Sequence, residues 1–260
     1  MRSVVPQNVS AHFLGSPTAL AAQSRCDCRG EAHGDGWGAA ALEGEQLRIH
    51  RSTLPAHADP RFAALASSLA TTLMLAHVRQ ASVGQVSIEN THPFAHGRWA
   101  FAHNGTLQNF AAGRARLLAA IPRDLQAQIA GQTDSEHIFY LLLGKIRAFA
   151  GSLDDAVSPD ALIATLSGSL HLLDAWFPAH NGEQTKLNFL LTDGRLLTAT
   201  CWKHSLHVLD ADGPEIATNL GQSLMIASEP TSDGPWQPVA DRSLLVVDKQ
   251  LHVHRSPIDV

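Results

Sequence analysis

Five short polar segments between residues 33 and 136 contain residue types that could bind and activate a small substrate. They combine paired glycines, an arginine after an apolar run, a His-Pro pair, an Asn-Gly pair and an acidic helix start, at residues 33–38, 76–82, 89–94, 102–107 and 133–136. Taken singly, these are glycine turns, a strand end and a helix cap, and each is a weak signal. The chain also has 19 basic residues, of which only four are Lys. Such an excess of Arg suits carboxylate recognition, although genome composition explains it equally well.

The order and spacing of these segments resemble the class II glutamine amidotransferases, which belong to the N-terminal nucleophile hydrolases. The resemblance is densest from His33 to Glu136 and continues weakly over residues 187–247, where the stretch at 226–230 looks like the short standalone members. It implies an α+β fold, a four-layer αββα sandwich of two antiparallel sheets flanked by helices. It also implies a reaction in which an N-terminal Cys attacks the glutamine side-chain amide, with its own α-amine as base. Water or a second substrate then resolves the thioester.

The resemblance assigns roles to four of these residues. Arg79 matches the family's arginine for the glutamine α-carboxylate, a contact that suits a planar guanidinium. Asp134 matches the carboxylate for the substrate α-amine, although a plain helix N-cap fits the same spacing. Asn104 and Gly105 match the oxyanion hole, a side-chain amide and a backbone N–H aimed at developing charge. The alternative for this pair is a hairpin turn.

Two further residues and one short segment match lining or scaffold positions of the family. Ser82 and His92 align with family positions that line the pocket, although a His before Pro is often only a packed loop residue. Residues 33–35 fall where the family has a glycine turn beside the nucleophile, and we interpret them first as scaffold.

The start of the sequence departs from the family, which requires Cys at the first position of the mature chain. This chain begins Met1-Arg2. Arg2 is too large a neighbour for routine removal of Met1, and neither residue is a nucleophile. Either the family's opening strand lies ahead of Arg2, or Arg2 itself stands where the Cys belongs. Cys26, Cys28 and Cys201 offer no free α-amine without cleavage, and we interpret them as small buried or surface thiols.

Two hypotheses on function stay open. In the first, the true start is a Met-Cys several residues upstream, and the protein is a glutamine amidotransferase or γ-glutamyl amide hydrolase. In the second, it is a catalytically inactive relative that keeps the glutamine pocket. We favour the first, because the substrate-binding set looks intact and an enzyme inactive for long should lose it.

A metallohydrolase is the alternative from a different class, because the chain has 15 His. His92 and His96 have helix-compatible spacing, but Pro93 lies between them. The HExxH pattern is absent and the acidic residues are not clustered. We therefore expect no metal and no cofactor.

Composition bounds the remaining possibilities. A length of 260 residues with 45% hydrophobic and 17% charged residues predicts a folded protein, which we interpret as one amidotransferase domain over residues 1–260. The net charge of −5 disfavours nucleic acid and anionic membranes as partners. Three Cys and a start unlike a signal peptide favour the cytoplasm. The expected ligand is glutamine or a γ-glutamyl small molecule, with an acceptor enzyme or a homodimer as possible protein partners.

The pattern of apolar residues and turn signals predicts the elements that must position these residues. A hairpin is expected over 36–42 and 47–50, a helix over 62–73, and strands over 75–79 and 99–103. Helices are expected over 107–118, 125–130 and 135–149, and from Ser158-Pro159 to Trp176. Strands follow over 187–191, 196–201, 205–209, 223–227, 243–247 and 251–254. Helices between two sets of strands favour two packed antiparallel sheets.

Overall fold

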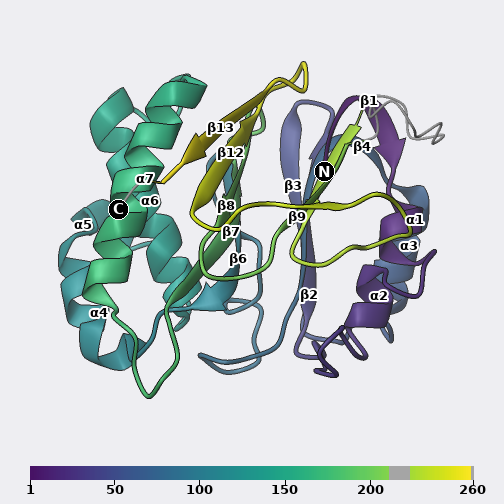
Figure 1. Cartoon of the computed structure of the whole chain (residues 1–260), viewed down its shortest axis with the longest axis horizontal. Coiled ribbons are helices and arrows are strands. Elements are labelled where there is room, and N and C mark those ends of the chain that lie inside the picture. The colour runs from purple at the N-terminus through teal and green to yellow at the C-terminus, as the bar shows by residue number, and fades with distance from the viewer. Residues whose placement is uncertain (211–222, 259–260) are drawn as a thin grey trace.

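Two antiparallel β-sheets lie face to face, and helices cover both outer faces (Figure 1). The computed structural model describes residues 1–210 and 223–258. One sheet has seven strands in the order β11-β9-β10-β1-β4-β2-β3, and the other has six in the order β13-β12-β8-β7-β6-β5. This arrangement confirms the α+β fold and its four αββα layers.

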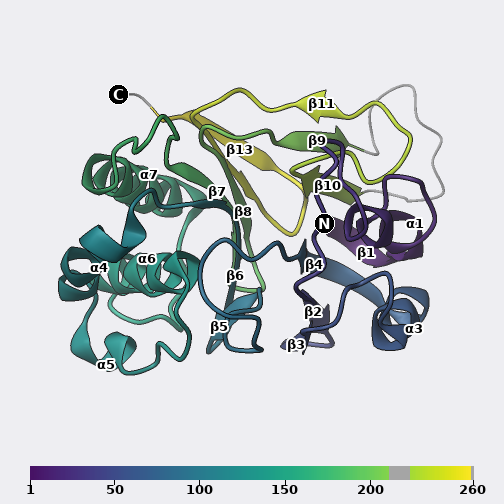
Figure 2. The same ribbon diagram turned by 90° about the horizontal axis from the view of Figure 1, so that it is seen from below.

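The chain passes from the seven-stranded half of the sandwich to the six-stranded half, returns once to the first half and ends in the second. The strands of the seven-stranded sheet are β1 (Arg2–Asn8), β2 (Trp37–Glu43), β3 (Gln46–Ser52), β4 (Ala70–Val78), β9 (His207–Asp210), β10 (Ser223–Ala227) and β11 (Gln237–Pro238). Those of the six-stranded sheet are β5 (Phe94–His96), β6 (Trp99–Thr106), β7 (Lys186–Thr192), β8 (Leu197–Cys201), β12 (Ser243–Val247) and β13 (Val253–Pro257). The helices are α1 (Ser10–Phe13), α2 (Leu20–Gln23), α3 (Pro60–Ser68), α4 (Phe110–Ala119), α5 (Arg123–Gln126), α6 (Asp134–Ala150) and α7 (Pro159–Trp176). Helices α1–α3 lie on the seven-stranded sheet and α4–α7 on the six-stranded one (Figure 2).

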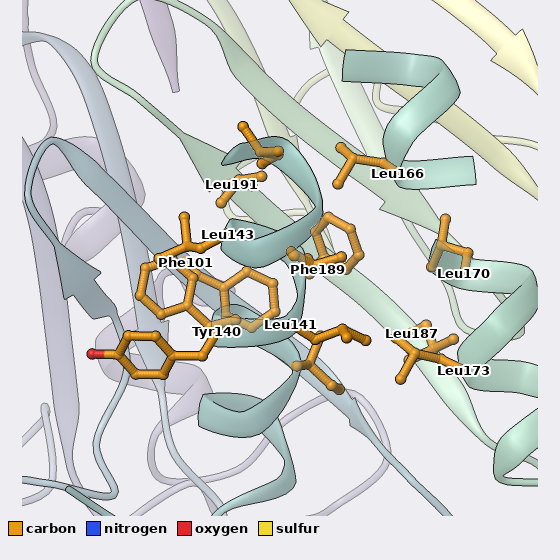
Figure 3. Packing of buried hydrophobic residues seen from close by; sticks show 14 of the residues in the cluster. Phe101, Tyr140, Leu141, Leu143, Leu166, Leu170, Leu173, Leu187, Phe189 and Leu191 are labelled. Atoms are coloured by element: carbon orange, nitrogen blue, oxygen red, sulfur yellow. The ribbon is translucent and has the colours of Figure 1, made fainter. Parts of the chain in front are cut away.

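Three hydrophobic clusters hold the four layers together. The largest lies between the six-stranded sheet and helices α4–α7, where Phe101 and Phe189 of the sheet pack against Leu141 and Leu143 of α6 (Figure 3). Small side chains such as Ala40 of β2 and Ala199 of β8 lie between the two sheets. Helix α6 is buried on almost every side, because 12 of its 17 residues are buried.

The two long helices begin at side-chain caps. The Thr133 hydroxyl accepts the Glu136 N–H at 3.2 Å before α6, and the Ser158 hydroxyl accepts the Ala161 N–H at 3.3 Å before α7. Pro159 takes the first helical position of α7, where its missing N–H costs nothing. The predicted β2–β3 hairpin is confirmed as well, with Gly44 at φ 64° in its turn.

Two element predictions are wrong. The helix expected over 62–73 ends at Ser68, and β4 begins at Ala70, because Leu69 is extended and the next residues pair with both β1 and β2. The turn expected at Asn104-Gly105 is a continuation of β6, in which these residues pair with Asn188 and Leu187 of β7. The helix expected over 125–130 shares only residues 125 and 126 with α5, which begins at Arg123 and ends at Gln126. The elements β1, β5, β11, α1 and α2 were not predicted.

Within the described residues, every helix is too short or too polar to cross a lipid bilayer.

Candidate functional site

A cavity of about 380 Å³ lies where the ends of the two sheets meet, and all six predicted site residues line it. They are Arg79, Ser82, His92, Asn104, Gly105 and Asp134. Cavities of this size suit small-molecule ligands. The fold thus brings together residues that are spread over residues 79–134 of the chain.

The backbone around Arg79 is fixed by the glycine segment at residues 33–38. The Arg79 N–H donates to the Gly36 carbonyl at 2.8 Å, and the Asp35 N–H donates to the Arg79 carbonyl at 2.9 Å. The Asp35 carboxylate accepts the Ala81 N–H at 2.8 Å and so holds the start of the following loop. Gly36 has φ 124°, and a Cβ there would lie 2.6 Å from the Ser52 carbonyl oxygen. These contacts favour the scaffold role expected for this segment.

The Arg79 side chain is 3% exposed and already holds part of the loop beside the cavity. Its Nη1 donates to the Gln85 carbonyl at 3.3 Å, and its Nη2 donates to those of Val83 and Gly84 at 3.2 and 3.4 Å. A guanidinium has five N–H donors, so these three bonds leave two for a ligand. Burial lowers the pKa of Arg79, yet a guanidinium keeps its charge across the physiological range.

Asn104 and Gly105 lie side by side at the cavity end of β6. The Asn104 Nδ2 donates to the Ser228 hydroxyl at 2.8 Å, so this amide is already oriented toward the opposite sheet. A Cβ on Gly105 would overlap the Lys186 carbonyl oxygen of β7, and only glycine lets the two strands pair here. The two groups are a side-chain amide and a backbone N–H held by a sheet rather than by a turn.

Asp134 is the first residue of α6, and Thr133 rather than Asp134 is the N-cap. The Asp134 carboxylate is buried, accepting the Leu107 N–H at 2.7 Å and the Ser135 N–H at 2.8 Å. It therefore ties the end of β6 to the start of α6. The Ser135 hydroxyl also donates to this carboxylate at 3.4 Å. A carboxylate has about four lone-pair sites, so these three bonds leave one for an ammonium group in the cavity.

Asp134→Asn is expected to lower the free energy of unfolding by about 1–3 kcal/mol, because an amide NH₂ would face one of two buried N–H donors. Urea unfolding followed by circular dichroism measures this change. Asp160→Asn is the matched control, because Asp160 lies in the first turn of α7 but is exposed. Equal effects of the two substitutions would show that the Asp134 contacts do not stabilise the fold.

Three imidazole rings form one wall of the cavity. The His77 and His92 rings are tilted by 39° to each other with centroids 4.3 Å apart, and the His103 Nδ1 lies 2.9 Å from the Ser135 hydroxyl. Both ring nitrogens of His92 are buried and lack a hydrogen-bond partner within the described part of the chain. His92 is therefore both a packed residue and a lining residue. The His92–Pro93 peptide bond is cis.

Lining residues from distant elements were missed by sequence reasoning. His12 of α1 is buried, its Nδ1 lies 3.0 Å from the Thr231 hydroxyl, and its Nε2 lacks a partner among the described residues. Burial, and then the charge of the Met1 amine, lower its pKa to about 4. Met1 and Ser228 also line the cavity. Only Ser228 fell in a segment that the sequence pattern had marked.

Acid is expected to destabilise the protein through these buried histidines. Burial lowers the pKa of His12 to about 4 and that of His77 to about 3, where His33, His103 and Arg79 add repulsion. The unfolded chain binds these protons near pH 6.5, so stability falls as the pH drops from about 6.5 to the folded pKa values. Each of the two residues then removes roughly 2 kcal/mol between pH 7 and pH 5.

Urea unfolding at pH 7, 6 and 5 measures this loss. His77→Asn should flatten the pH dependence, whereas His180→Asn, at an exposed position, should leave it unchanged. A wild-type stability that stays constant down to pH 5 would contradict the prediction.

Neither thiols nor metal ligands gather in the described part of the cavity. Cys26 and Cys28 are exposed, Cys201 is buried outside the cavity, and burial raises the pKa of Cys201 to about 11. No group of three or more His, Cys, Asp or Glu side chains in the described residues is arranged to hold a metal ion. His92 and His96 lie on different sides of Pro93, with His96 in β5.

Ser82 lies at the rim of the cavity rather than within it. It is exposed, and its hydroxyl lies 3.5 Å from that of Thr106 at the end of β6. Its position on the loop that Arg79 holds leaves its hydroxyl free to turn toward a ligand.

Known proteins are similar to this chain in sequence and in fold. The family model for class-II glutamine amidotransferases matches residues 14–226. The γ-glutamyl-hercynylcysteine sulfoxide hydrolase of Mycobacterium tuberculosis strain H37Rv is 31% identical over 93% of this chain and 88% of its own. The probable glutamine amidotransferase DUG3 of Saccharomyces cerevisiae is 29% identical over 87% of this chain and 72% of its own.

A glutamine aminotransferase class-II domain protein from Silicibacter pomeroyi has the same fold. Its structure superposes with a TM-score of 0.64 at 23% identity, covering 85% of this chain and 90% of its own. With the family model matching most of the sequence, the chain belongs to the class-II glutamine amidotransferases.

Proposed function

We propose that the cavity binds the γ-glutamyl group of glutamine or of a γ-glutamyl amide, and that the complete site hydrolyses the side-chain amide. The observation that carries the proposal is the convergence of Arg79 and Asp134, buried groups of opposite charge, on one cavity with Asn104 and Gly105. Glutamine carries an α-carboxylate and an α-ammonium group. Arg79 complements the first and Asp134 the second.

The chemistry at the other end of the substrate follows from Asn104 and Gly105. When a nucleophile attacks the amide carbon, the carbonyl oxygen becomes an oxyanion. The Asn104 Nδ2 and the Gly105 N–H are the donors for that charge, and one such donor contributes about 2.7–4 kcal/mol in known enzymes. Asn104 would exchange its bond to the Ser228 hydroxyl for one to the oxyanion. The products are ammonia or an amine and, after water resolves the acyl intermediate, glutamate.

The name of the mycobacterial relative, a γ-glutamyl-hercynylcysteine sulfoxide hydrolase, supports a γ-glutamyl compound larger than glutamine as the substrate. If glutamine itself is the substrate, the ammonia released would pass to an acceptor enzyme. The protein partner would then be that enzyme or a second copy of this chain.

The second candidate is a glutamine-binding relative without catalytic activity. It is favoured by the cavity lining within the described residues, which includes Met1 but no thiol. Both candidates predict binding of L-glutamine, and only the first predicts release of ammonia.

Isothermal titration calorimetry with L-glutamine tests the binding on which both candidates depend. The expected result is one saturable site for L-glutamine and none for D-glutamine, whose α-carboxylate and α-ammonium groups exchange places. Identical titrations with the two enantiomers, or no heat with either, would overturn the proposed function.

A further inference from the structure

The cavity extends past the groups that suit a γ-glutamyl ligand. Its volume of about 380 Å³ lies in the range of sites for drug-sized molecules, which are larger than glutamine. Four charged or titratable side chains outside the proposed γ-glutamyl contacts line one region of it, which we call the outer part of the cavity: Arg29, Lys186, His204 and Glu229. Arg29 comes from the loop between α2 and β2, and Lys186 is the first residue of β7.

The Lys186 side chain lies on the same face of its sheet as the Asn104 amide. Asn104 and Thr106 of β6 pair with Asn188 and Lys186 of β7. Leu187 packs in the cluster on the helix side of the sheet, and successive side chains of a strand point to opposite faces. Lys186 therefore faces the cavity. It occupies the position diagonal to Asn104, and residues so placed lie about 7–8 Å apart, within reach of a long side chain.

The two cations of the outer part lack a carboxylate partner. Neither the Lys186 ammonium nor the Arg29 guanidinium forms an ion pair within residues 1–210 and 223–258. Lys186 is half-buried and Arg29 is exposed. Burial lowers the pKa of His204, and the charges of Arg29 and Lys186 lower it further. Both cations thus lie close enough to the same imidazole ring to act on it.

The carboxylates nearby are engaged with the loop backbone or exposed to water. Asp27 accepts the N–H groups of Arg29 and Glu31, both at 2.8 Å. The Glu229 carboxylate accepts the Cys28 N–H at 3.3 Å. The Glu31 side chain also lines the cavity but is exposed. Two of these three acids therefore hold the loop in place, and the outer part keeps positive charge available for a ligand.

A carboxylate close to the γ-amide nitrogen would meet this charge. When the nitrogen of the γ-amide belongs to an α-amino acid, the carboxylate carbon of that amino acid is two bonds from the nitrogen. The nitrogen is bonded to the same carbon as the carbonyl oxygen, which the proposed function places at Asn104 and Gly105. Such a carboxylate then lies near the diagonal position that Lys186 occupies. A lysine ammonium forms a charge-assisted hydrogen bond with it.

We propose that Lys186, together with Arg29, binds a carboxylate on the amine portion of the substrate, and that the preferred ligand is a γ-glutamyl derivative of an α-amino acid. The inference rests on the proposed function and narrows it, because glutamine has no such carboxylate. The ligand then has two carboxylates at opposite ends. Arg79 binds the one on the glutamyl portion, and Lys186 binds the other.

Calorimetry on the wild-type protein with two ligands of the same shape tests the proposal. γ-L-Glutamylglycine has the second carboxylate, and γ-L-glutamylglycinamide has an uncharged amide in its place. The glycine derivative should bind about tenfold more tightly, as expected for one charge-assisted contact. Equal affinities would overturn the proposal. Tighter binding of γ-L-glutamylputrescine, whose free ammonium group suits Glu229 and Glu31, would overturn it as well.

Three variants assign this preference to a side chain. Lys186→Gln should remove most of it, because the amide carries no charge. Lys186→Arg should keep a preference of about threefold or more, since the charge stays but the geometry of the donors changes. Lys145→Gln is the matched control and should behave as wild type, because Lys145 is exposed on α6 and does not line the cavity. A full tenfold preference in Lys186→Gln would contradict the role of Lys186.

L-Glutamine distinguishes a failure of this inference from a failure of the proposed function. Binding of L-glutamine to the wild-type protein, with equal affinities for the two glycine derivatives, removes the carboxylate site alone. If neither L-glutamine nor γ-L-glutamylglycine binds, the proposed function itself is wrong and the inference falls with it.

Discussion

Arg79→Ala is expected to weaken L-glutamine binding on the order of 100-fold, the largest effect of any single side chain in the cavity. The substitution removes the one buried cation at the position proposed for the α-carboxylate. A buried carboxylate without a partner costs more than the lost contact itself, since its desolvation is no longer offset. Isothermal titration calorimetry at constant ionic strength measures the change.

Arg51→Ala is the matched control for that experiment. Arg51 also holds loop carbonyls, since its Nη1 donates to Ile88 and Thr91 at 3.3 Å, but it does not line the cavity. It should leave glutamine affinity within about threefold, as expected for a charge outside the site. Similar losses in the two variants would mean that Arg79 acts by ordering the loop and not by contacting the ligand.

Gly105→Ala is expected to destabilise the fold by about 3 kcal/mol or more, because the added Cβ would overlap the Lys186 carbonyl oxygen. That oxygen belongs to the backbone of β7, which cannot move without disturbing the ladder over 100–106. The His103 Nε2 would lie 2.7 Å from the same Cβ. Thermal and urea unfolding should both record the loss.

Gly168→Ala in α7 is the opposite case and serves as control. A Cβ at Gly168 would meet nothing within 4 Å, and alanine favours helix by about 0.5–1 kcal/mol over glycine. This variant should be slightly more stable than wild type. A Gly105→Ala protein as stable as Gly168→Ala would show that β6 and β7 can separate at no cost.

The sequence predicted well those elements whose ends are set by local chemistry. Thr133 and Ser158 cap α6 and α7 through their own hydroxyls, and the turn at Gly44 closes the β2–β3 hairpin. In each case the determining contact lies within three or four residues. These contacts form within one short segment and need no partner from far along the chain, so the sequence alone indicates them.

The wrong predictions concern elements whose conformation is decided by partners far along the chain. Residues 69–73 have apolar spacing that suits a helix, but the segment lies at the centre of a sheet, and the Thr71 hydroxyl donates to the Leu42 carbonyl at 2.7 Å. The Asn104-Gly105 pair favours a turn by itself, but β7 extends it as a strand. Tertiary pairing overrides local propensity at both places.

The candidate site shows the same division. The site residues between 79 and 134 belong to recognisable sequence segments, so the sequence alone predicted them as one site. His12 and Thr231 are 219 residues apart, and only the fold places the ring and the hydroxyl 3.0 Å from each other. Met1 enters the cavity through the register of β1, an element that local patterns did not reveal.

The burial of α6 has a consequence for how this protein could acquire new substrates. A helix with 12 of its 17 residues buried accepts few substitutions at those positions, because its neighbours feel each change in volume. Asp134 is the first residue of this helix, so we expect it to vary little. The proposed contact between Asp134 and the substrate α-ammonium group should then vary little as well. The exposed residues at the rim, such as Arg29, Gln80 and Ser82, carry no such constraint. Related proteins with different substrates should therefore differ mainly at these rim residues. The differences should concern the part of the substrate attached to the γ-amide nitrogen.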